Sequence, residues 1–275
     1  MDRQFDSAWF SLKGKTAVVT GGTGLLGKPF CKGLAEFGAN VAVVDLDEQL
    51  CTSFAQELQE AYGIKAVGIG CDVAVPQMVS AMVEKTVAAL GRIDILHNNA
   101  AGQSSDPDAF FAPFEDYTLA QWRNIMSVNI DGMFLVAQAV GKQMVHRGAG
   151  GSIIQTSSIY GAMAPDQRIY EGSLYNGRPI NTPAVYSVSK AGVIGLTRYL
   201  ATYWADKGIR VNCISPGGVE SGQNAQFQTR YSARIPLGRM AHPNEMVGTL
   251  IYLASDASSY VTGQNFLVDG GLSAW

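Results

Sequence analysis

Seven short apolar runs, separated by long amphipathic stretches, constrain the fold of this chain more than any other feature. The runs are rich in β-branched residues, too short for helices and mostly apolar on both faces, as strands buried in a parallel sheet are. This alternation predicts a doubly wound α/β fold, with a seven-stranded parallel sheet and helices on both faces. The runs cover residues 16–20, 41–45, 66–71, 93–97, 152–156, 210–214 and 266–268.

The stretches between these runs carry signals for helix ends. A helix over residues 47–62 is predicted to end at Gly63, and another to begin at Pro76 and stop at Gly91. Proline is favoured at the start of a helix and glycine just after its end. A further stretch, residues 118–144, has apolar side chains at helical spacing.

Two stretches break this rhythm. Residues 161–182 and 217–236 are polar, rich in glycine and proline, and show no clear period. Loops of this length in a compact domain are usually functional. Because no repeat or linker divides the chain, we expect one domain over residues 1–275, with both loops on its substrate side.

The composition excludes several classes of protein. Only 16% of the residues are charged, against roughly 25% in typical soluble proteins. The net charge of −3 includes no basic stripe, so neither nucleic acid nor a membrane surface is expected as a partner. The chain has no apolar run of transmembrane length and no signal-peptide pattern, which predicts a cytoplasmic protein. Scattered cysteines and histidines predict reduced thiols and no metal site.

A glycine-rich turn follows the first predicted strand. Its sequence is TGGTGLLG, and its candidate binding residues are Gly21, Thr23, Gly24, Leu26 and Gly27. Such a turn lets the backbone approach a pyrophosphate, and the following helix start offers N–H groups with partial positive charge. The alternative is a tight turn whose glycines only pack the helix. Its position in the first strand–helix–strand unit favours a Rossmann-type dinucleotide site.

Asp45 ends the second predicted strand, about 20 residues after the glycine turn. A carboxylate at this place can bond the adenosine ribose hydroxyls and repels a 2′-phosphate. No arginine or lysine follows it directly. The alternative role, capping the next helix, fits Asp47 equally well. We therefore expect NAD as the cofactor, rather than NADP.

Two tyrosine–lysine pairs have the spacing that places both side chains on one helical face. They are Tyr186 with Lys190, and Tyr203 with Lys207. The spacing alone does not distinguish them. Tyr186 stands near the start of a predicted helix, after a strand and a loop. The second pair stands near the far end of that helix beside Asp206, which predicts an ordinary surface pair.

These motifs, in this order, resemble those of the compact branch of the short-chain dehydrogenase/reductase family. The resemblance covers about residues 12–273 and implies an oxidoreductase that uses NAD(P) and acts on CH–OH groups. It further implies a homodimer or homotetramer formed through the long helices. The motifs after the glycine turn are Asp72-Val73, Asn98-Asn99-Ala100-Ala101, Asn129, Ser157-Ser158, Tyr186 with Lys190, Pro216-Gly217 and Val268-Asp269-Gly270-Gly271.

The resemblance also assigns roles to single residues. The catalytic tetrad it implies is Asn129, Ser158, Tyr186 and Lys190. The further cofactor contacts it implies are Asp72 and Val73 at the adenine, Asn99 and Ala100 along the cofactor, and Pro216, Gly217, Val219 and Ser221 at the nicotinamide. The alternatives are structural: an amide that satisfies backbone groups for Asn129, and a strand-end cap for Ser158.

The chemistry expected of the tetrad follows from electrostatics. Positive charge on Lys190 and on the oxidised nicotinamide favours the phenolate of Tyr186 and lowers its pKa. Tyr186 then accepts the alcohol proton, or donates it in the reverse direction. Ser158 orients the reacting oxygen. Asn129 is expected to hold a water molecule that links Lys190 to solvent.

The chain departs from the family pattern in two places. Leu25 stands where the compact branch usually has its middle glycine, which gives a spacing more typical of the extended branch. The gap between Ser158 and Tyr186 is about twice the usual one, so an insertion, residues 161–182, is expected to overhang the active site.

The insertion is the main clue to the substrate. Its hydrogen-bonding side chains favour a sugar, sugar acid or sugar derivative, with Arg168, Tyr170 and Arg178 as candidate contacts. Long insertions at this place resemble those of relatives in surface-carbohydrate and nonulosonate-type pathways. The loop could instead form a subunit interface. The rival functions are a β-ketoacyl or general carbonyl reductase and a non-catalytic dinucleotide-binding protein.

Overall fold

One parallel sheet organises the chain, whose structure, a computed structural model, describes residues 6–102, 104, 106–175 and 177–275. The strand order is β3-β2-β1-β4-β5-β8-β9, and every neighbouring pair is parallel. The predicted seven-stranded doubly wound fold is thus confirmed. The strands are β1 (Thr16–Thr20), β2 (Asn40–Asp45), β3 (Ala66–Gly70), β4 (Ile95–Asn98), β5 (Gly151–Thr156), β8 (Ile209–Pro216) and β9 (Asn265–Val268).

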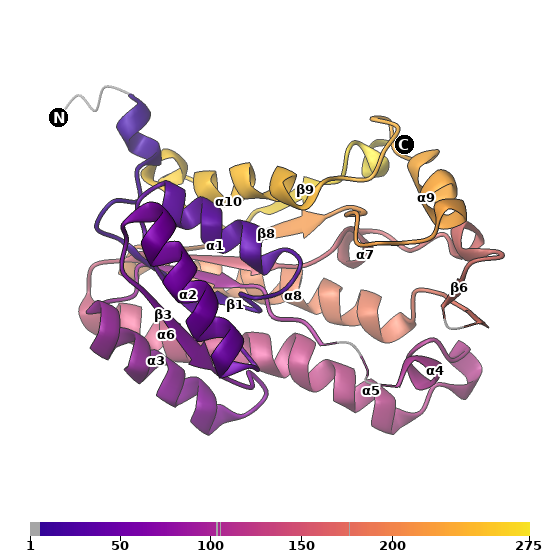
Figure 1. Cartoon of the computed structure of the whole chain (residues 1–275), viewed down its shortest axis with the longest axis horizontal. Helices are drawn as coiled ribbons and strands as arrows, with labels where there is room; N and C mark the ends of the chain where they lie inside the picture. The colour runs from indigo at the N-terminus through magenta and orange to yellow at the C-terminus, as the bar shows by residue number, and fades with distance from the viewer. Residues whose placement is uncertain (1–5, 103, 105, 176) are drawn as a thin grey trace.

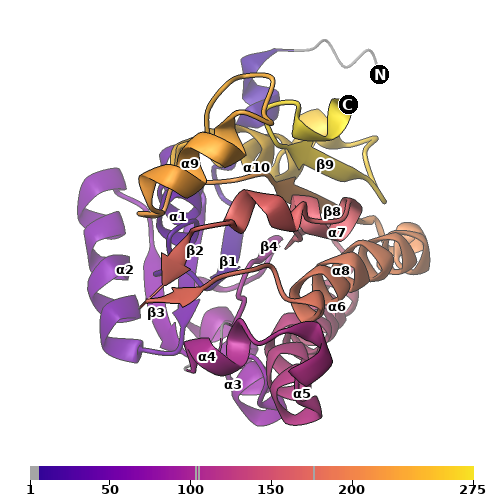
Figure 2. The same cartoon turned by 90° about the vertical axis from the view of Figure 1, so that its right-hand side faces the viewer.

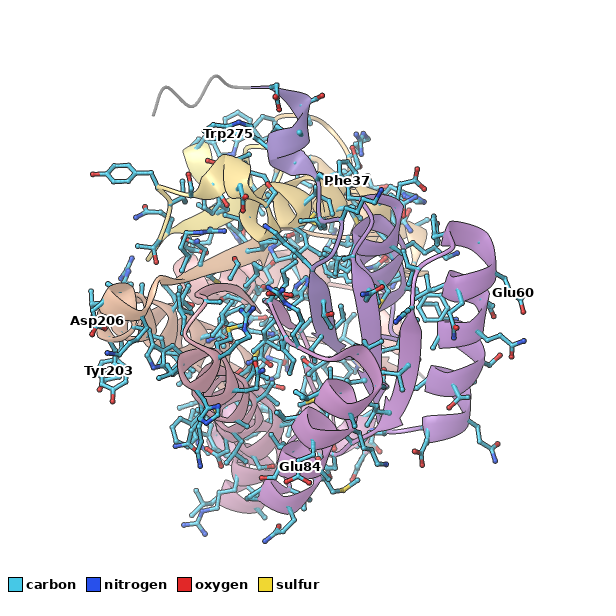
Figure 3. All side chains as sticks on the ribbon, turned by 90° about the vertical axis from the view of Figure 1, so that its left-hand side faces the viewer. Phe37, Glu60, Glu84, Tyr203, Asp206 and Trp275 are labelled. Atoms are coloured by element: carbon cyan, nitrogen blue, oxygen red, sulfur yellow. The ribbon has the colours of Figure 1, made fainter. Side chains whose placement is uncertain are left out.

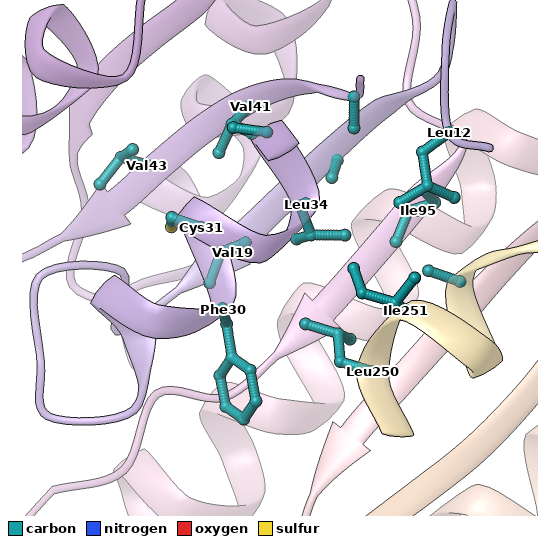
Figure 4. Close-up of a cluster of buried hydrophobic side chains, with 14 of the residues drawn as sticks. Leu12, Val19, Phe30, Cys31, Leu34, Val41, Val43, Ile95, Leu250 and Ile251 are labelled. Carbon is teal, nitrogen blue, oxygen red and sulfur yellow. The ribbon is translucent and has the colours of Figure 1, made fainter. Parts of the chain in front are cut away.

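Helices cover both faces of this sheet (Figures 1 and 2). One face packs against α1 (Gly27–Glu36), α2 (Glu48–Tyr62) and α10 (Val247–Ala254), and the other against α3 (Pro76–Leu90), α6 (Met133–Arg147) and α8 (Ala184–Tyr203). Alternate residues of β1 face opposite sides of the sheet. Val19 packs in the first hydrophobic cluster, on the side of α1, and Val18 packs in the second, on the side of α3. Figure 4 shows the first cluster, with Phe30 of α1 and Leu250 of α10 among the strand side chains.

The helix ends follow the local signals in the sequence. The Asp47 carboxylate accepts hydrogen bonds from two N–H groups of the first turn of α2, and Gly63 ends that helix in a left-handed conformation, with φ of 66°. Pro76 opens α3, and Gly91 ends it with φ of 83°. The predicted helical stretch 118–144 is not one regular helix, because a π-helical segment, Ser127–Gly132, separates α5 (Leu119–Met126) from α6.

The two long loops contain short elements of their own. The insertion 161–182 holds a two-stranded antiparallel hairpin, β6 (Leu174–Tyr175) with β7 (Arg178–Pro179), and the second loop holds α9 (Ala225–Ser232). Figure 1 shows β6, α9 and α4 grouped at one end of the molecule. The other short helices are α4 (Pro107–Phe110) and α7 (Ile159–Ala162), with single 3₁₀ turns at Ser7–Phe10, Phe114–Asp116, Gln167–Tyr170, Ala205–Lys207, Pro243–Met246, Asp256–Ser258 and Leu272–Ala274.

Within the described ranges, no helix is long and apolar enough to cross a membrane. The same part of the chain has no group of three or more His, Cys, Asp or Glu side chains that could hold a metal ion. All four cysteines are buried thiols.

Candidate active site

The glycine turn lies against the start of α1 and the end of β4. Gly21 has a left-handed φ of 65°, and a Cβ atom there would lie 3.1 Å from the Cα atom of Ala100. A Cβ atom on Gly27 would lie 1.9 Å from the carbonyl oxygen of Gly21, so this close approach requires glycine. Leu25, in place of the family's middle glycine, is 51% exposed. Leu26 directly precedes α1.

The carboxylate of Asp45 reaches this turn from the end of β2. It accepts hydrogen bonds from the Thr23 N–H at 3.1 Å and the Thr23 hydroxyl at 2.6 Å, and its other oxygen accepts one from the Leu46 N–H at 2.9 Å. Because Asp47 caps α2, Asp45 is not the cap of that helix. The structure therefore places a carboxylate beside the glycine turn.

Residues after β3 and β4 line the same edge of the sheet. The Asp72 carboxylate accepts a hydrogen bond from the Ala74 N–H at 2.9 Å, next to the buried Val73. The Thr20 hydroxyl accepts from the N–H groups of Asn99 and Ala100, at 2.9 and 3.0 Å. Thr20 thus ties the end of β1 to the chain that follows β4. This role was not predicted from the sequence, although the position of Thr20 at the end of the strand before the glycine turn was a usable signal.

The loop after β8 completes this edge. Pro216 ends β8, and a Cβ atom on Gly217 would lie 2.7 Å from the Cα atom of Asp269. Val219 pairs with Ala241 in an isolated parallel bridge. Ser221 follows, and its N–H donates to the side chain of Gln223 at 2.8 Å.

Ser158 and Tyr186 meet where β5 and α8 approach each other. Ser158 caps α7, and its hydroxyl accepts a hydrogen bond from the Tyr160 N–H at 3.2 Å. Burial raises the pKa of Tyr186, while a hydrogen bond with Ser158 acts in the opposite direction. Among the protein groups alone, burial outweighs this hydrogen bond, so their net effect is to raise the pKa of Tyr186.

Lys190 lies one helical turn after Tyr186 and is 3% exposed. Its ammonium donates to the Thr156 carbonyl at 3.1 Å and lies 5.9 Å from the centre of the Tyr186 ring. Burial lowers the pKa of Lys190 to about 8. A ring nitrogen of His97 lies 2.8 Å from the Thr156 hydroxyl, and burial lowers the pKa of His97 to about 3, so this histidine is neutral.

Asn129 lies fully buried in the π-helical segment. Its amide oxygen accepts from the Gly102 N–H at 2.8 Å, and its amide nitrogen donates to the Ser189 hydroxyl at 3.3 Å. The Ser189 hydroxyl donates to the Tyr186 carbonyl at 2.8 Å. Asn129 is therefore connected to α8 beside the tyrosine. Ser189 was missed in the sequence, although its position directly before Lys190 was a usable signal.

The second tyrosine–lysine pair lies on the surface, as its sequence context predicts. Tyr203 is 62% exposed, and the Lys207 ammonium pairs with the Asp206 carboxylate at 2.8 Å. Figure 3 shows Tyr203 and Asp206 together on the outer edge of the molecule.

A cavity of about 660 Å³ opens beside Ser158 and Tyr186. Both long loops contribute to it, but its wall is more aromatic than their polar sequences suggested. The aromatic residues of this wall were not predicted from the sequence, because they come from separate segments without a shared motif. They are Phe110, Phe111, Tyr160, Phe227 and Tyr231.

The three candidate substrate residues differ in their placement. Tyr170 lines the cavity, bonds its hydroxyl to the Thr182 hydroxyl and stacks on Phe227 with ring centres 5.3 Å apart. Arg168, in contrast, is not among the residues that line the cavity. Its side chain is 84% exposed, and its guanidinium makes two hydrogen bonds of 2.8 Å to the Asp166 carboxylate. The side chain of Arg178 lies outside the described part of the chain.

Comparisons with known proteins agree with this architecture. Residues 25–273 match the sequence model of the enoyl-(acyl carrier protein) reductase family. The chain is 36% identical over 267 residues to D-threitol dehydrogenase from Mycolicibacterium smegmatis, covering 95% of this chain and 94% of that protein.

Two solved structures have closely similar folds. A gluconate 5-dehydrogenase from Burkholderia cenocepacia, in complex with NADP and tartrate, has a TM-score of 0.85 at 34% identity, over 97% of this chain and 98% of that one. A short-chain dehydrogenase from Leptospira borgpetersenii with bound NAD⁺ has a TM-score of 0.83 at 32% identity, over 99% and 98% of the two chains.

Proposed function

This chain belongs to the short-chain dehydrogenase/reductase family, whose members are NAD(P)-binding oxidoreductases that act on CH–OH groups, and from that premise we propose that it is an NAD-dependent dehydrogenase of a sugar, sugar acid or sugar derivative. It transfers hydride between a secondary alcohol or ketone and nicotinamide. The observation that carries the proposal is the meeting of Ser158, Tyr186 and Lys190 beside a cavity of about 660 Å³. The activities of the D-threitol and gluconate relatives support the substrate class.

The edge of the sheet at the ends of β1, β2 and β4 fits a dinucleotide. The turn at Gly21 and Gly27 has no room for side chains, so its backbone is free to meet a pyrophosphate at the start of α1. We assign the pyrophosphate to the turn of Gly21, Thr23, Gly24, Leu26 and Gly27, the adenine to Asp72 and Val73, and the nicotinamide half to Asn99, Ala100, Tyr186, Lys190, Pro216, Gly217, Val219 and Ser221. The whole chain, residues 1–275, then acts as one nucleotide-binding domain.

Asp45 is the proposed reason for a preference for NAD. Its carboxylate is fixed beside the turn by Thr23 and Leu46, where it can accept from ribose hydroxyls. A 2′-phosphate at the same place would meet a negative charge. Relatives of similar fold bind either NADP or NAD⁺, so the preference has to come from residues of this kind.

The proposed proton transfer uses Tyr186. When bound, the nicotinamide accepts or supplies hydride at the reacting carbon. Tyr186 takes the proton of the alcohol oxygen, or returns it to the ketone oxygen, and the nearby Lys190 charge favours the phenolate that this requires. Ser158 hydrogen-bonds the reacting oxygen. Asn129 positions α8 through Ser189, and its remaining amide capacity holds the water that links Lys190 to solvent.

A substrate panel tests this proposal. Purified protein is incubated with NAD or NADP and with sugar alcohols, sugars, sugar acids and sugar nucleotides, and the reduced nicotinamide is followed by its absorbance. We expect turnover with polyhydroxy substrates and NAD. Activity confined to β-ketoacyl thioesters would support the main alternative instead.

That alternative, a β-ketoacyl or general carbonyl reductase, has one observation in its favour. Apolar residues such as Ile159 and Met240 line part of the cavity, and an acyl chain would pack on them. The other alternative, a non-catalytic dinucleotide-binding protein, predicts NAD binding without turnover on any substrate. The presence of the whole tetrad argues against it.

We also propose a homodimer or homotetramer, located in the cytoplasm. Large apolar side chains are exposed on the long helices α5, α6 and α8, which supports an interface there. Light scattering of the purified protein tests the oligomeric state. The exposed apolar side chains on α5, α6 and α8 are Leu119, Phe134, Val188, Tyr199 and Tyr203.

A further inference from the structure

Side chains of α9 bond the main chain of the insertion 161–182, at the end of the molecule where the two lie side by side (Figures 1 and 2). Nη1 of Arg230 donates to the main-chain oxygens of Arg168 and Glu171, at 3.2 and 2.6 Å, and lies 3.5 Å from the Glu171 carboxylate. Nε2 of Gln226, one turn earlier on α9, donates to the same Glu171 main-chain oxygen at 3.2 Å. Because the acceptors are main-chain atoms, these bonds fix the path of the insertion itself.

The insertion and α9 also approach each other closely beside these bonds. Gly172 has a left-handed φ of 74°, and a Cβ atom there would lie 2.6 Å from Nε2 of Gln226. Tyr170 stacks on Phe227 of α9, and the adjacent Ile169, which is 3% exposed, belongs to the same apolar cluster as Phe227. The contact thus combines backbone approach, ring stacking and burial, and does not depend on exposed ion pairs, which contribute little.

The helix α9 also contacts the loop after β8, to which we assign the nicotinamide at Gly217. Gly218 has no room for a Cβ atom, because ring carbons of Tyr231 lie against its backbone. Tyr231 is buried in the same apolar cluster as Ile169 of the insertion, and Tyr186 packs against that cluster. One short helix therefore contacts the insertion, the proposed nicotinamide loop and the cluster beside the reacting phenol.

We propose that Arg230 is a positioning residue, whose bonds to the main chain make the insertion order together with α9. The inference rests on the proposed cofactor site: NAD bound at Gly217 orders the loop against Tyr231, and Arg230 extends that order to the insertion. NAD then prepares the wall that the substrate meets, because order established by the first ligand does not have to be established again by the second. The insertion's part of this wall is Tyr170, Leu174, Ile180, Asn181 and Thr182.

Hydrogen exchange of backbone amides tests this inference without a substrate. The whole protein is compared with and without saturating NAD, and deuterium uptake is followed in the glycine turn, residues 20–27, and in the insertion, residues 166–175. We expect NAD to slow exchange in both regions, in the insertion by roughly tenfold, which is within the usual range for coupled sites. Protection confined to the glycine turn would overturn the inference and leave the proposed function standing.

Two arginine variants separate the bonds of Arg230 from its charge. Arg230→Met keeps the aliphatic part of the side chain and loses the donors, so the effect of NAD on the insertion should disappear while its effect on the glycine turn persists. The matched control is Arg168→Met, because the Arg168 guanidinium bonds Asp166 two residues away, and the main-chain oxygen that Arg230 bonds remains. We expect Arg168→Met to behave like the parent protein. Equal losses in the two variants would contradict the role of Arg230.

The ratio of exchange rates without and with NAD distinguishes positioning from a purely structural role. A purely structural role of Arg230 would speed exchange of the insertion in Arg230→Met by the same factor in both states and leave this ratio unchanged, which would overturn the inference. Should Arg230→Met not fold, Gln226→Met removes a bond to the same Glu171 oxygen and should lower the ratio in part, and an unchanged ratio there would equally contradict the inference. If NAD protects neither region of the parent protein, the proposed cofactor site fails, and the inference fails with it.

Discussion

At the level of single residues, Tyr186 and Tyr203 form a natural pair for comparison, because each begins the same tyrosine–lysine spacing on one helix, α8. Tyr186 is beside Ser158 and the cavity, whereas Tyr203 is 62% exposed. We expect Tyr186→Phe to lower kcat by about 10²–10⁴-fold, the usual effect of losing a general acid–base group. NAD binding should persist. Tyr203→Phe should be nearly silent, and equal losses in the two variants would contradict the assignment of Tyr186.

Lys190 affects both the activity and the stability of the protein. Burial lowers its pKa to about 8, while the unfolded chain binds the same proton up to about pH 10.4. The buried charge therefore destabilises the fold fully below about pH 8, and this cost is relieved as the pH rises through the window between the two values.

The variant Lys190→Met tests whether the buried charge of Lys190 destabilises the fold. We expect it to be inactive but to melt at a higher temperature than the parent at pH 7, with the advantage shrinking between about pH 8 and 10. Thermal unfolding at several pH values measures this. A variant that is less stable at pH 7, with no pH-dependent difference from the parent, would show that the Thr156 hydrogen bond outweighs the burial of charge.

At the level of elements, the turn between β1 and α1 depends on how closely its backbone segments approach. A methyl group on Gly27 would lie 1.9 Å from the Gly21 carbonyl oxygen, so the turn has to open. We expect Gly27→Ala to lower stability by about 1–3 kcal/mol, as overpacking does, and to weaken NAD binding strongly. Gly195→Ala is the control. It adds a methyl group to an exposed site of α8 with nothing within 4 Å, and should gain about 0.5–1 kcal/mol.

At the level of the whole molecule, the proposed cofactor spans the place where the strand order reverses between β1 and β4. Residues from both halves of the sheet then hold one ligand. We expect NAD at 100 times its Kd to raise the free energy of unfolding by about 2.7 kcal/mol in one cooperative transition. NADP at the same concentration should stabilise less, and replacing Asp45 by Ala together with Leu46→Arg should reverse that order. Equal stabilisation of the parent protein by both cofactors would contradict the role of Asp45.

The sequence by itself determined the strands, the helix ends and the family. A strand buried in a parallel sheet is apolar on both faces, so runs such as 152–156 are visible without knowledge of their neighbours. The caps at Asp47 and Gly63 are equally local, because each satisfies backbone groups within one turn, and Pro76 at the start of α3 has no N–H group that would need a partner. The catalytic candidates could be named because their motifs are short and occur in a fixed order.

Only the tertiary structure decided what surrounds the reacting atoms. Phe110, Tyr160 and Phe227 come from three separate short helices, and no local pattern shows that they face one cavity. The insertion is polar in sequence, yet Arg168 turns outward because the Asp166 carboxylate is within reach of its guanidinium. Side-chain direction depends on which partner satisfies a charge at the lowest cost of desolvation. Asp166 is only two residues from Arg168, but Arg234, which lies 3.6 Å from the same carboxylate, belongs to a distant segment that contacts the insertion only in the folded molecule.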